Sequence, residues 1–313
     1  MPIQTRFPLV SIVLATFNGE AFLAQLLDSV LAQTYPNIEI VAVDDGSTDT
    51  TINILNSYAS TNGKIKVFAN SVNIGYIKNF QKACKLSSGE YIALCDQDDE
   101  WHIDKVKHMI ETIGEHPMVY CDSIVCDEHL GDTGKRISSF VNCRSRYSCL
   151  ELSVFCRIYG NATLFKRSLF EDADPFPDMI PHDWWLSYVA TLHGGIKYLD
   201  EPLILYRQHS TNIFGAIGSS SRKKNDKKRQ KKKEEILKIR MRIGRFYEIC
   251  PKELITEKKV LADLQSSYQN FSFFNNMHRM IIFFSNYKTL LFVKKRSLLR
   301  KYVFCIKMFA IIK

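Results

Sequence analysis

Short apolar runs and longer amphipathic stretches alternate along the first third of the chain. Runs rich in β-branched residues predict buried strands at 9–15, 38–43, 65–68 and 91–95. Between these runs, apolar residues recur at the spacing of one helix face, which predicts helices over 20–33, 48–60 and 73–86. Because strands and helices alternate with short loops, we expect an α/β fold, with a parallel sheet covered by helices on both faces.

The same patterns continue less regularly in the middle of the chain. They predict strands over 119–126, 159–165 and 198–207, a helix over 183–193 and a polar loop over 127–146. Residues 234–270 are also expected to be helical. Ser47 or Thr48 is the expected N-cap of the helix that follows the second strand.

Polar residues follow three of the predicted strands. They are Thr16-Phe17-Asn18 after the first, Asp44-Asp45 at the end of the second and Asp96-Gln97-Asp98-Asp99 after the fourth. Ligands of such sheets bind beyond the carboxyl ends of the strands. We therefore expect these three clusters to converge on one pocket.

The third cluster holds three carboxylates within four residues, at the end of a buried strand. Like charges this close repel each other and resist burial, so a cation is one expected partner. Oxygen ligands without His or Cys favour Mg²⁺ or Mn²⁺, typically shared with substrate phosphates. The alternative is an acidic loop in which Asp99 is the N-cap of a helix starting near Trp101.

Several classes of protein are excluded or disfavoured by the motifs. The chain contains neither GxGxxG nor GxxxxGK[ST], which argues against a dinucleotide oxidoreductase and a P-loop enzyme. Its nine cysteines include no CxxC pair, which suits free thiols in a reducing cytosol. No signal peptide is expected, because a strand-like run follows Arg6. An aromatic residue, acids on a second strand and a metal-type acid cluster together suit a nucleotide diphosphate.

Five segments of the chain resemble family 2 glycosyltransferases, which have the GT-A fold. They are VSIVLATFNG, VAVDDGSTD, NIGYIKNF, GEYIALCDQDDEW and PHDWW, in the order and spacing of that family. The resemblance covers roughly residues 9–215. It implies a Rossmann-like nucleotide-sugar-binding domain over 1–218. CDQDDEW, PHDWWLSYVA and YLDEPLILYRQHSTNIFGA look most like bacterial rhamnosyltransferases of cell-surface polysaccharides.

The resemblance also implies roles for individual residues. Asp44, with Asp45 beside it, matches the acid that pairs with a pyrimidine base, and Phe17 matches a flanking aromatic. Asp96-Gln97-Asp98 matches the DxD motif, in which the first acid faces the ribose and Asp98 binds the metal. Asp183 matches the general base of inverting members. The residues expected on the acceptor side are Asn161, His182 and Trp184.

Four residues either differ from the family pattern or have two interpretations. His182 stands where many family members have Glu, which leaves its role open. Ile103 stands where many have Pro, a difference that looks harmless. Arg207 and His209 are expected either to contact the departing diphosphate or to be an ordinary surface pair.

Charge divides the chain into an acidic front and two basic blocks. Residues 1–221 hold 17 basic and 26 acidic residues, whereas 222–233 hold nine and one, and 278–313 hold nine and none. We expect a basic linker over 219–233 and a helical extension over 234–313. Near 280–313, Leu291, Leu298, Tyr302, Ile306 and Phe309 are expected to share one face of an amphipathic helix.

Two interpretations of the basic blocks follow from their composition. Either they dock on an anionic membrane as an in-plane helix, or they pack on the protein itself while the linker is solvated. No apolar run reaches the length of a spanning helix. No nucleic-acid recognition motif accompanies the basic run, so nucleic acid is not an expected partner. The resemblance implies a cytoplasmic enzyme, peripheral on the inner face of the cell membrane.

The expected reaction is inverting transfer of a sugar to a polyprenyl-diphosphate-linked glycan. The expected donor is dTDP-L-rhamnose, and a UDP-hexose is the alternative. A nucleotidyltransferase would need a Gly-rich loop after the first strand, where Thr16-Phe17-Asn18-Gly19 stands. A non-catalytic glycan-binding protein would be indicated by loss of Asp98 or Asp183, and both are present.

Overall fold

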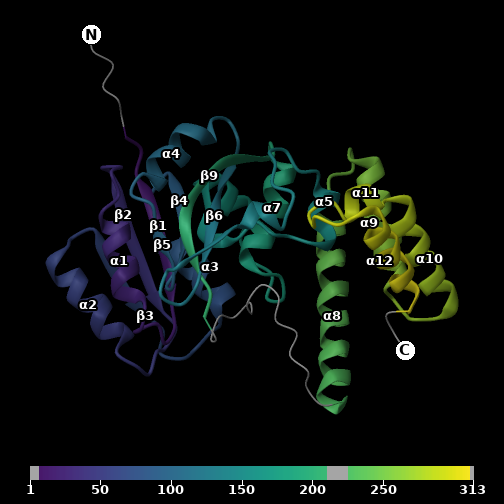
Figure 1. Cartoon of the computed structure of the whole chain (residues 1–313), viewed down its shortest axis with the longest axis horizontal. Coiled ribbons are helices and arrows are strands. Elements are labelled where there is room, and N and C mark those ends of the chain that lie inside the picture. Colours follow the sequence, from purple (N-terminus) through teal and green to yellow (C-terminus); the bar gives the residue numbers. More distant parts are fainter. Residues whose placement is uncertain (1–6, 210–224, 311–313) are drawn as a thin grey trace, which may run out of the picture. The chain divides into compact units, whose positions relative to one another are not determined.

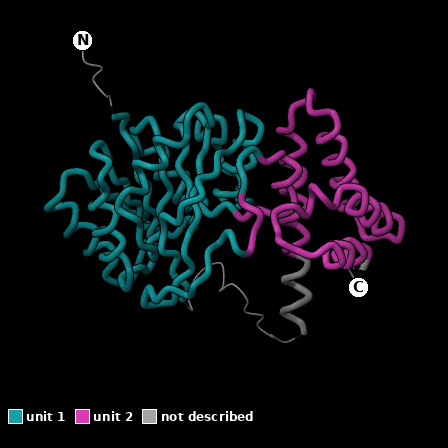
Figure 2. The backbone as a smooth tube through the Cα atoms, turned by 45° about the horizontal axis from the view of Figure 1, so that its top comes forward, with its two compact units in different colours: residues 1–139, 144–146, 158–214 teal, residues 140–143, 147–157, 215–313 magenta. Residues whose placement is uncertain are grey.

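The computed structural model describes residues 7–209 and 225–310, and the chain folds into two compact units (Figure 2). Unit 1 comprises 1–139, 144–146 and 158–214, and unit 2 comprises 140–143, 147–157 and 215–313. Residues 140–143 and 147–157 therefore belong to unit 2, whereas the predicted division places them in the first domain. The predicted boundary at 218 lies outside the described residues.

The first half of the unit 1 sheet follows the prediction. The strands β1 (Val10–Thr16), β2 (Ile38–Asp44), β3 (Ile65–Ala69) and β4 (Tyr91–Asp96) are parallel, in the order β3-β2-β1-β4. Their carboxyl ends therefore lie at one edge (Figure 1). In register, Thr16 of β1 faces Asp44 of β2, and Ala15 of β1 faces Asp96 of β4.

The second half of the sheet is mixed, whereas the strand–helix alternation predicts only the parallel first half. Here β8 (Thr163–Lys166) runs antiparallel to both its neighbours, β4 and β6 (Met118–Cys126). The long β9 (Ile196–Arg207) is parallel to β6, and the short β5 (Glu100–Trp101) is antiparallel to β9. β7 (Asp132–Arg136) pairs with β6 inside the predicted polar loop and is followed by a 3-10 helix, Ile137–Ser139. A second 3-10 helix, Gly160–Ala162, occupies the start of the strand predicted at 159.

Helices cover both faces of this sheet, as predicted. α1 (Leu23–Leu31), α2 (Thr51–Thr61) and α4 (Lys105–Ile113) supply residues to one large apolar cluster with the strands. α3 (Tyr76–Leu86) packs on β1 and β2 but contributes nothing to that cluster, so it covers the other face. Near it lie α6 (Arg167–Ala173) and α7 (His182–Leu192).

Two predicted helix starts are wrong, each for its own reason. α2 begins at Thr51, because the Ser47 amide and hydroxyl both donate to the Asp44 carboxylate, at 2.8 and 2.5 Å. α4 begins at Lys105 with Asp104 as its N-cap residue. Asp99 therefore caps no helix, since the chain passes through β5 before α4 begins.

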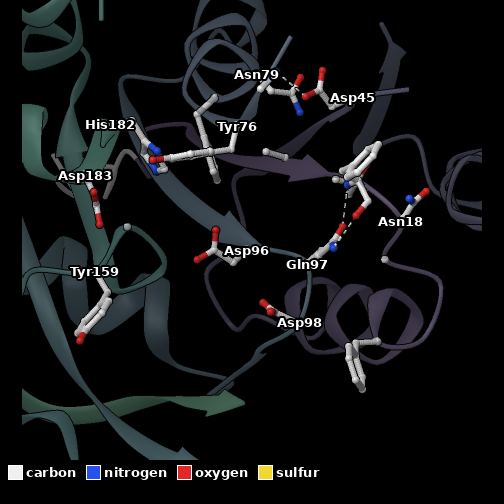
Figure 3. A pocket seen from close by; sticks show the side chains of 18 of the residues that line it. Asn18, Asp45, Tyr76, Asn79, Asp96, Gln97, Asp98, Tyr159, His182 and Asp183 are labelled. Atoms are coloured by element: carbon white, nitrogen blue, oxygen red, sulfur yellow. Dashed lines mark hydrogen bonds between the residues drawn. The ribbon is translucent and has the colours of Figure 1, made fainter. Parts of the chain in front are cut away.

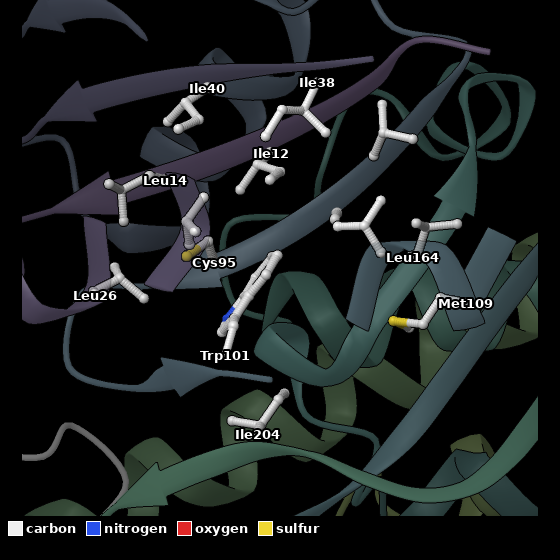
Figure 4. Close-up of a cluster of buried hydrophobic side chains, with 14 of the residues drawn as sticks. Ile12, Leu14, Leu26, Ile38, Ile40, Cys95, Trp101, Met109, Leu164 and Ile204 are labelled. Atoms are coloured by element: carbon white, nitrogen blue, oxygen red, sulfur yellow. The ribbon is translucent and has the colours of Figure 1, made fainter. Parts of the chain in front are cut away.

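The core cluster brings together residues from strands and helices that are distant in sequence (Figure 4). Ile12 and Leu14 point to the same side of β1 because side chains alternate along a strand. Trp101 lies among them, beside Leu26 of α1 and Ile204 of β9. This packing fixes the segment that directly follows the acidic cluster.

Unit 2 is helical in its described residues, as predicted. It contains α5 (Cys149–Val154), α8 (Asn225–Ile249), α9 (Ile255–Ser267), α10 (Phe273–Ser285), α11 (Tyr287–Leu290) and α12 (Leu298–Ala310). Residues 225–233 belong to α8, so a helix occupies this part of the predicted linker, while 219–224 lie outside the described residues.

A buried arginine joins three of these helices. Arg279 of α10 donates to the carbonyls of Ser267 at 2.8 Å and Met308 at 3.2 Å, and its guanidinium lies 4.6 Å from the Tyr268 ring centre. Leu291 is the C-cap of α11 and lies outside α12, so it does not share one helix face with Leu298, Tyr302, Ile306 and Phe309 as predicted. Among the described helices, none is both long and apolar enough to span a bilayer.

Gly89 provides a test of the packing between β1 and the start of β4. An added Cβ would lie 2.7 Å from the Leu9 carbonyl oxygen and the Ser11 amide nitrogen, which are backbone atoms unable to move aside. We expect Gly89→Ala to lower the free energy of unfolding by about 1–3 kcal/mol, measured by urea denaturation.

Gly63→Ala is the matched control, because no atom lies within 4 Å of its added Cβ. It should leave the free energy of unfolding unchanged or slightly raised. Equal effects of the two substitutions would contradict the packing described here.

Candidate active site

A cavity of about 730 Å³ opens at the carboxyl ends of the unit 1 strands. Its wall includes residues from each of the three predicted polar clusters, together with α3, α7 and the end of β9 (Figure 3). The predicted convergence on one pocket is therefore confirmed. All of its lining residues belong to unit 1.

Asp44, the last residue of β2, and Asp45, which follows it, differ in position. Asp45 lines the cavity and accepts from the Ile74 and Gly75 amides at 2.8 and 2.9 Å, which orders the loop before α3. Asp44 is buried behind the wall and accepts from the Thr16 hydroxyl at 2.9 Å. The structure thus offers Asp45 at the pocket surface, while base pairing by Asp44 stays a prediction.

The loop after β1 is tied to the acidic loop. Phe17, a residue that is 45% exposed, lines the cavity, and its place beside a base stays a prediction. Its amide donates to Gln97 Oε1 at 2.9 Å, and Gln97 Nε2 donates to the Phe17 carbonyl at 3.0 Å. Gly19 lies beside this pair: an added Cβ would lie 2.3 Å from Gln97 Oε1, so the Gln97 side chain would have to shift.

The three carboxylates after β4 have separate environments. Asp96 and Asp98 line the cavity, whereas Asp99 is fully buried beneath it. Burial, followed by the charges of Asp98 and Asp183, raises the pKa of Asp96 to about 7. Burial and the neighbouring acids also raise the pKa of Asp99 well above its usual range. Burial and mutual repulsion disfavour the charged forms of these carboxylates, and a bound cation would offset both effects.

Lys105 is a buried cation that the sequence pattern does not reveal. Its Nζ donates to the Asn161 carbonyl at 2.5 Å and lies 3.1 Å from the centre of the Trp101 ring. Burial lowers its pKa to about 8, while Asp99 and Asp96 are among the groups that oppose this shift. Nothing in the helical pattern distinguishes Lys105 from an exposed lysine, so only the fold identifies it.

Asn161, predicted on the acceptor side, does not line the cavity. Its amide donates to the Asp99 carboxylate from within the protein interior. Trp184, the second residue predicted there, also lies outside the cavity wall that the described residues form. Its backbone amide donates to Asp183 Oδ1 at 2.7 Å. The acceptor-side roles of both residues stay predictions that this wall does not support.

Arg207 and His209, which are predicted to act together, lie in different places. The Arg207 guanidinium is buried and donates to the carbonyls of Asp98 and Glu128, at 2.7 and 2.6 Å, and to Gln25 Oε1 at 2.7 Å. It does not line the cavity, so it holds the acidic loop from behind. His209 does line the cavity, with Nε2 2.9 Å from Asp98 Oδ2.

Asp183 and His182 begin α7 and both line the cavity. In Figure 3 they lie on the side of Asp96 that is opposite to Asn18. The cavity therefore has an end that holds Asn18 and Asp45 and another formed by α7, with Asp96 and Asp98 between them. Phe17, the chain neighbour of Asn18, also lines the cavity.

Several cavity residues have no role predicted from the sequence. From α3 come Tyr76, Asn79 and Phe80, and from later segments come Tyr159 and Tyr206. The first three belong to NIGYIKNF. The helical spacing of that segment predicts which side faces the sheet, but it does not show that the first turn reaches a cavity.

The family model of glycosyl transferase family 2 matches residues 11–173, which is more than half of the chain. The chain belongs to glycosyl transferase family 2. This family's matched segment contains β1 to β4 and the acidic cluster, and the confirmed fold class is α/β of the GT-A type.

Curated relatives resemble this family 2 chain over about two-thirds of its length. A dTDP-rhamnosyl transferase, RfbG of Shigella flexneri, is 30% identical over 213 residues, covering 65% of this chain and 74% of that protein. An uncharacterized protein of Mycobacterium tuberculosis is 29% identical over 213 residues, covering 66% and 60%. The matched part thus spans about three-fifths of the length of that relative.

A solved structure shows the same fold at low sequence identity. TarS of S. aureus, residues 1–349 with UDP-GlcNAc, has a TM-score of 0.61 and 18% identity, covering 96% of this chain and 80% of that one. Its similarity concerns the fold alone.

The side chains of Asp98 and His209 offer coordinating atoms that fit a divalent metal shared with a substrate. Asp98 and His209 present an oxygen and a nitrogen 2.9 Å apart at the cavity, with Asp96 two residues away. Among the described residues, no group of three or more acidic, His or Cys side chains could hold an ion alone. Diphosphate oxygens would therefore have to complete the coordination.

The buried His182 generates a prediction about stability and pH. Burial lowers the pKa of its imidazole from 6.5 to about 3, so the unfolded chain binds one more proton between these values. The free energy of unfolding should therefore fall as the pH drops below 6.5, by up to about 1.4 kcal/mol per pH unit from this group. His182→Phe should remove that part of the slope.

The measurement is urea denaturation of both proteins between pH 7 and pH 4.5. Acids elsewhere titrate equally in the two proteins, so the difference between their slopes isolates His182. Parallel curves would contradict a neutral, buried imidazole.

Proposed function

We propose that this protein is an inverting glycosyltransferase that moves a sugar from a nucleotide diphosphate to a hydroxyl of a glycan. The observation that carries this proposal is the order of groups along one cavity: Asn18 and Asp45 at one end, the acids Asp96 and Asp98 in the middle and the Asp183 carboxylate at the other end. A bound nucleotide sugar would match this order, because its nucleoside, diphosphate and reacting sugar follow one another.

Asp183 is the proposed general base. Its place in the first turn of α7, and the hydrogen bond from the Trp184 amide, fix the carboxylate at the cavity wall. It removes the acceptor proton as that oxygen attacks the anomeric carbon from the face opposite the diphosphate. A single displacement then inverts the configuration, and a well-placed base typically contributes roughly 10²–10⁴-fold to the rate.

Asp98 and His209 are the proposed holders of Mg²⁺ or Mn²⁺, with Asp96 facing the ribose side. When bound, such a metal neutralises the charge that develops on the leaving diphosphate. A mannosyltransferase of Pyrobaculum calidifontis with the same fold has a solved structure with GDP-Man and Mn²⁺, at 16% identity and a TM-score of 0.57, covering 99% of this chain and 86% of that one. That relative supports a metal-dependent reaction here.

The proposed donor is dTDP-L-rhamnose and the proposed acceptor a polyprenyl-diphosphate-linked glycan of a cell-surface polysaccharide. Identity of 30% to a dTDP-rhamnosyl transferase supports this donor. A UDP-hexose is the second candidate, favoured by the UDP-GlcNAc bound to TarS. Among the described residues, Asp45 is the one charged side chain at the Asn18 end of the cavity, which accommodates either pyrimidine.

Unit 2 is the proposed site of attachment to the inner face of an anionic membrane. On α12, Leu299, Val303 and Ile306 are exposed at the spacing of one helix face, with Leu299 72% exposed. Arg300 and Lys307 flank this face, while Cys305 and Met308 are buried beneath it. Residues 278–313 contain nine basic residues and no acidic one, a composition that complements anionic lipid.

Two variants of acids test the proposed reaction. Asp183→Asn should abolish transfer, with a loss of at least about 10²-fold, yet leave binding of the nucleotide sugar intact. Asp98→Asn should weaken nucleotide-sugar binding in Mg²⁺ or Mn²⁺ as well as transfer. Each is measured with purified dTDP-L-rhamnose, UDP-glucose and UDP-N-acetylglucosamine, by calorimetry and by product release.

Asp172→Asn is the matched control, since that acid is half-exposed and lies outside the cavity wall. It should behave like the unmodified enzyme. Transfer at the normal rate by Asp183→Asn would refute the assigned base, and full activity in EDTA would refute the metal.

Membrane docking is tested with a triple variant, Leu299→Ser, Val303→Ser and Ile306→Ser. We expect it to lose the part of vesicle binding that high salt does not remove, because that part reflects apolar insertion. Arg300→Gln with Lys307→Gln should lose the salt-sensitive part. Co-sedimentation with vesicles containing anionic phosphatidylglycerol measures both.

The control is Val72→Ser, which removes an apolar side chain that is 66% exposed in unit 1. A truncation after Met277 is a poorer test, because it would cut α10 and remove Arg279. Equal binding by the triple variant and the control would refute the role of this face.

A further inference from the structure

His182 has a buried side chain whose polar atoms are left unused. The residue is only 6% exposed, and neither Nδ1 nor Nε2 has a hydrogen-bond partner among the described residues. A buried polar group without a partner typically costs about 1–3 kcal/mol. Both nitrogens are covered in this structure, but the residue lines the cavity, so they lie next to the space that a bound molecule would fill.

The imidazole is held in place by aromatic packing. It stacks on Phe80 with ring centres 4.0 Å apart and an angle of 28° between the planes. Tyr76 lies edge-on, with its ring centre 5.8 Å away. Gly160 leaves room on a third side, since a Cβ added there would lie 3.0 Å from Nε2. The ring is therefore positioned before any ligand arrives.

Charge-based roles fit this environment poorly. Burial lowers the pKa of His182 to about 3, so the imidazole is neutral near pH 7. A neutral imidazole does not attract a phosphate as a cation, and a group with so low a pKa is a weak general base at pH 7. It does present one hydrogen-bond donor and one acceptor, the same pair that a hydroxyl presents.

We propose that His182 determines sugar specificity by hydrogen bonding to a hydroxyl of a sugar bound in the cavity. The inference rests on the proposed glycosyltransferase function and adds a recognition role beside the base. His182 precedes Asp183 on α7, at the end of the cavity away from Asn18, where the reacting sugars would meet (Figure 3). A site with an unpaired buried polar group selects strongly against a ligand that lacks the matching hydroxyl.

The test uses His182→Phe, which keeps a flat aromatic ring and removes both nitrogens. Calorimetric binding is measured for dTDP, dTDP-L-rhamnose, UDP and UDP-glucose, without acceptor. If the hydroxyl belongs to the donor sugar, the variant should bind the nucleotide sugar about tenfold more weakly and the nucleoside diphosphate equally well. His182→Gln, which retains a donor and an acceptor, should recover part of the loss.

A second measurement covers the acceptor. If the hydroxyl belongs to the acceptor sugar, donor binding is unchanged and the acceptor KM rises about tenfold in His182→Phe. Phe80→Leu is the control: it disturbs the packing of the ring but keeps the nitrogens, so it should shift nucleotide and nucleotide sugar alike.

A structural role is distinguished by thermal unfolding without ligand. Because its nitrogens are unsatisfied, replacing His182 by Phe should leave the unfolding temperature at pH 7 unchanged or raised. If donor binding and acceptor KM are both unchanged in His182→Phe, the inference is overturned. The proposed function would then still stand, provided that Asp183→Asn abolishes transfer.

Discussion

Asp99 and Lys105 are both fully buried beneath the acidic loop, and the placement of that loop depends on how their charges are compensated. Asn161 connects them, because its side-chain amide donates to Asp99 while its carbonyl accepts from Lys105. The Trp101 ring covers the ammonium group at 3.1 Å. Removing one member of such a buried network usually costs much more than the network contributes to stability, since the remaining charge has no partner. The two acids at the cavity surface therefore rest on a network that is sensitive to change at any member.

Arg207 extends this support to distant parts of unit 1. Its guanidinium, at the end of β9, binds the Asp98 carbonyl, the Glu128 carbonyl after β6 and Gln25 of α1. The ring of Phe22 covers it, 4.5 Å from the guanidinium carbon. The backbone of Asp98 is thus held by Arg207, which is itself fixed by two segments that lie far apart in the sequence.

The sequence was informative where one element determines the outcome. Strong apolar runs predicted β1 to β4, and their polar ends predicted the pocket, because parallel strands place those ends at one edge. The sequence was less informative where contacts between distant segments determine the structure. The directions of β8 and β5, the burial of Lys105 and Asn161, and the separation of Arg207 from His209 all depend on contacts between distant segments. The basic segment 225–233 shows the same limit, since its composition resembles a linker although it continues into the rest of α8. His182 could be flagged by its difference from the family pattern, but its unsatisfied nitrogens could only be found in the fold.

The paired hydrogen bonds between Gln97 and the Phe17 backbone have a consequence for motion. They join the loop that carries the aromatic wall to the residue that stands between Asp96 and Asp98. Gly19 lies against the same amide. A displacement of the Phe17 loop therefore also displaces the Gln97 side chain, which belongs to the segment that carries Asp96 and Asp98.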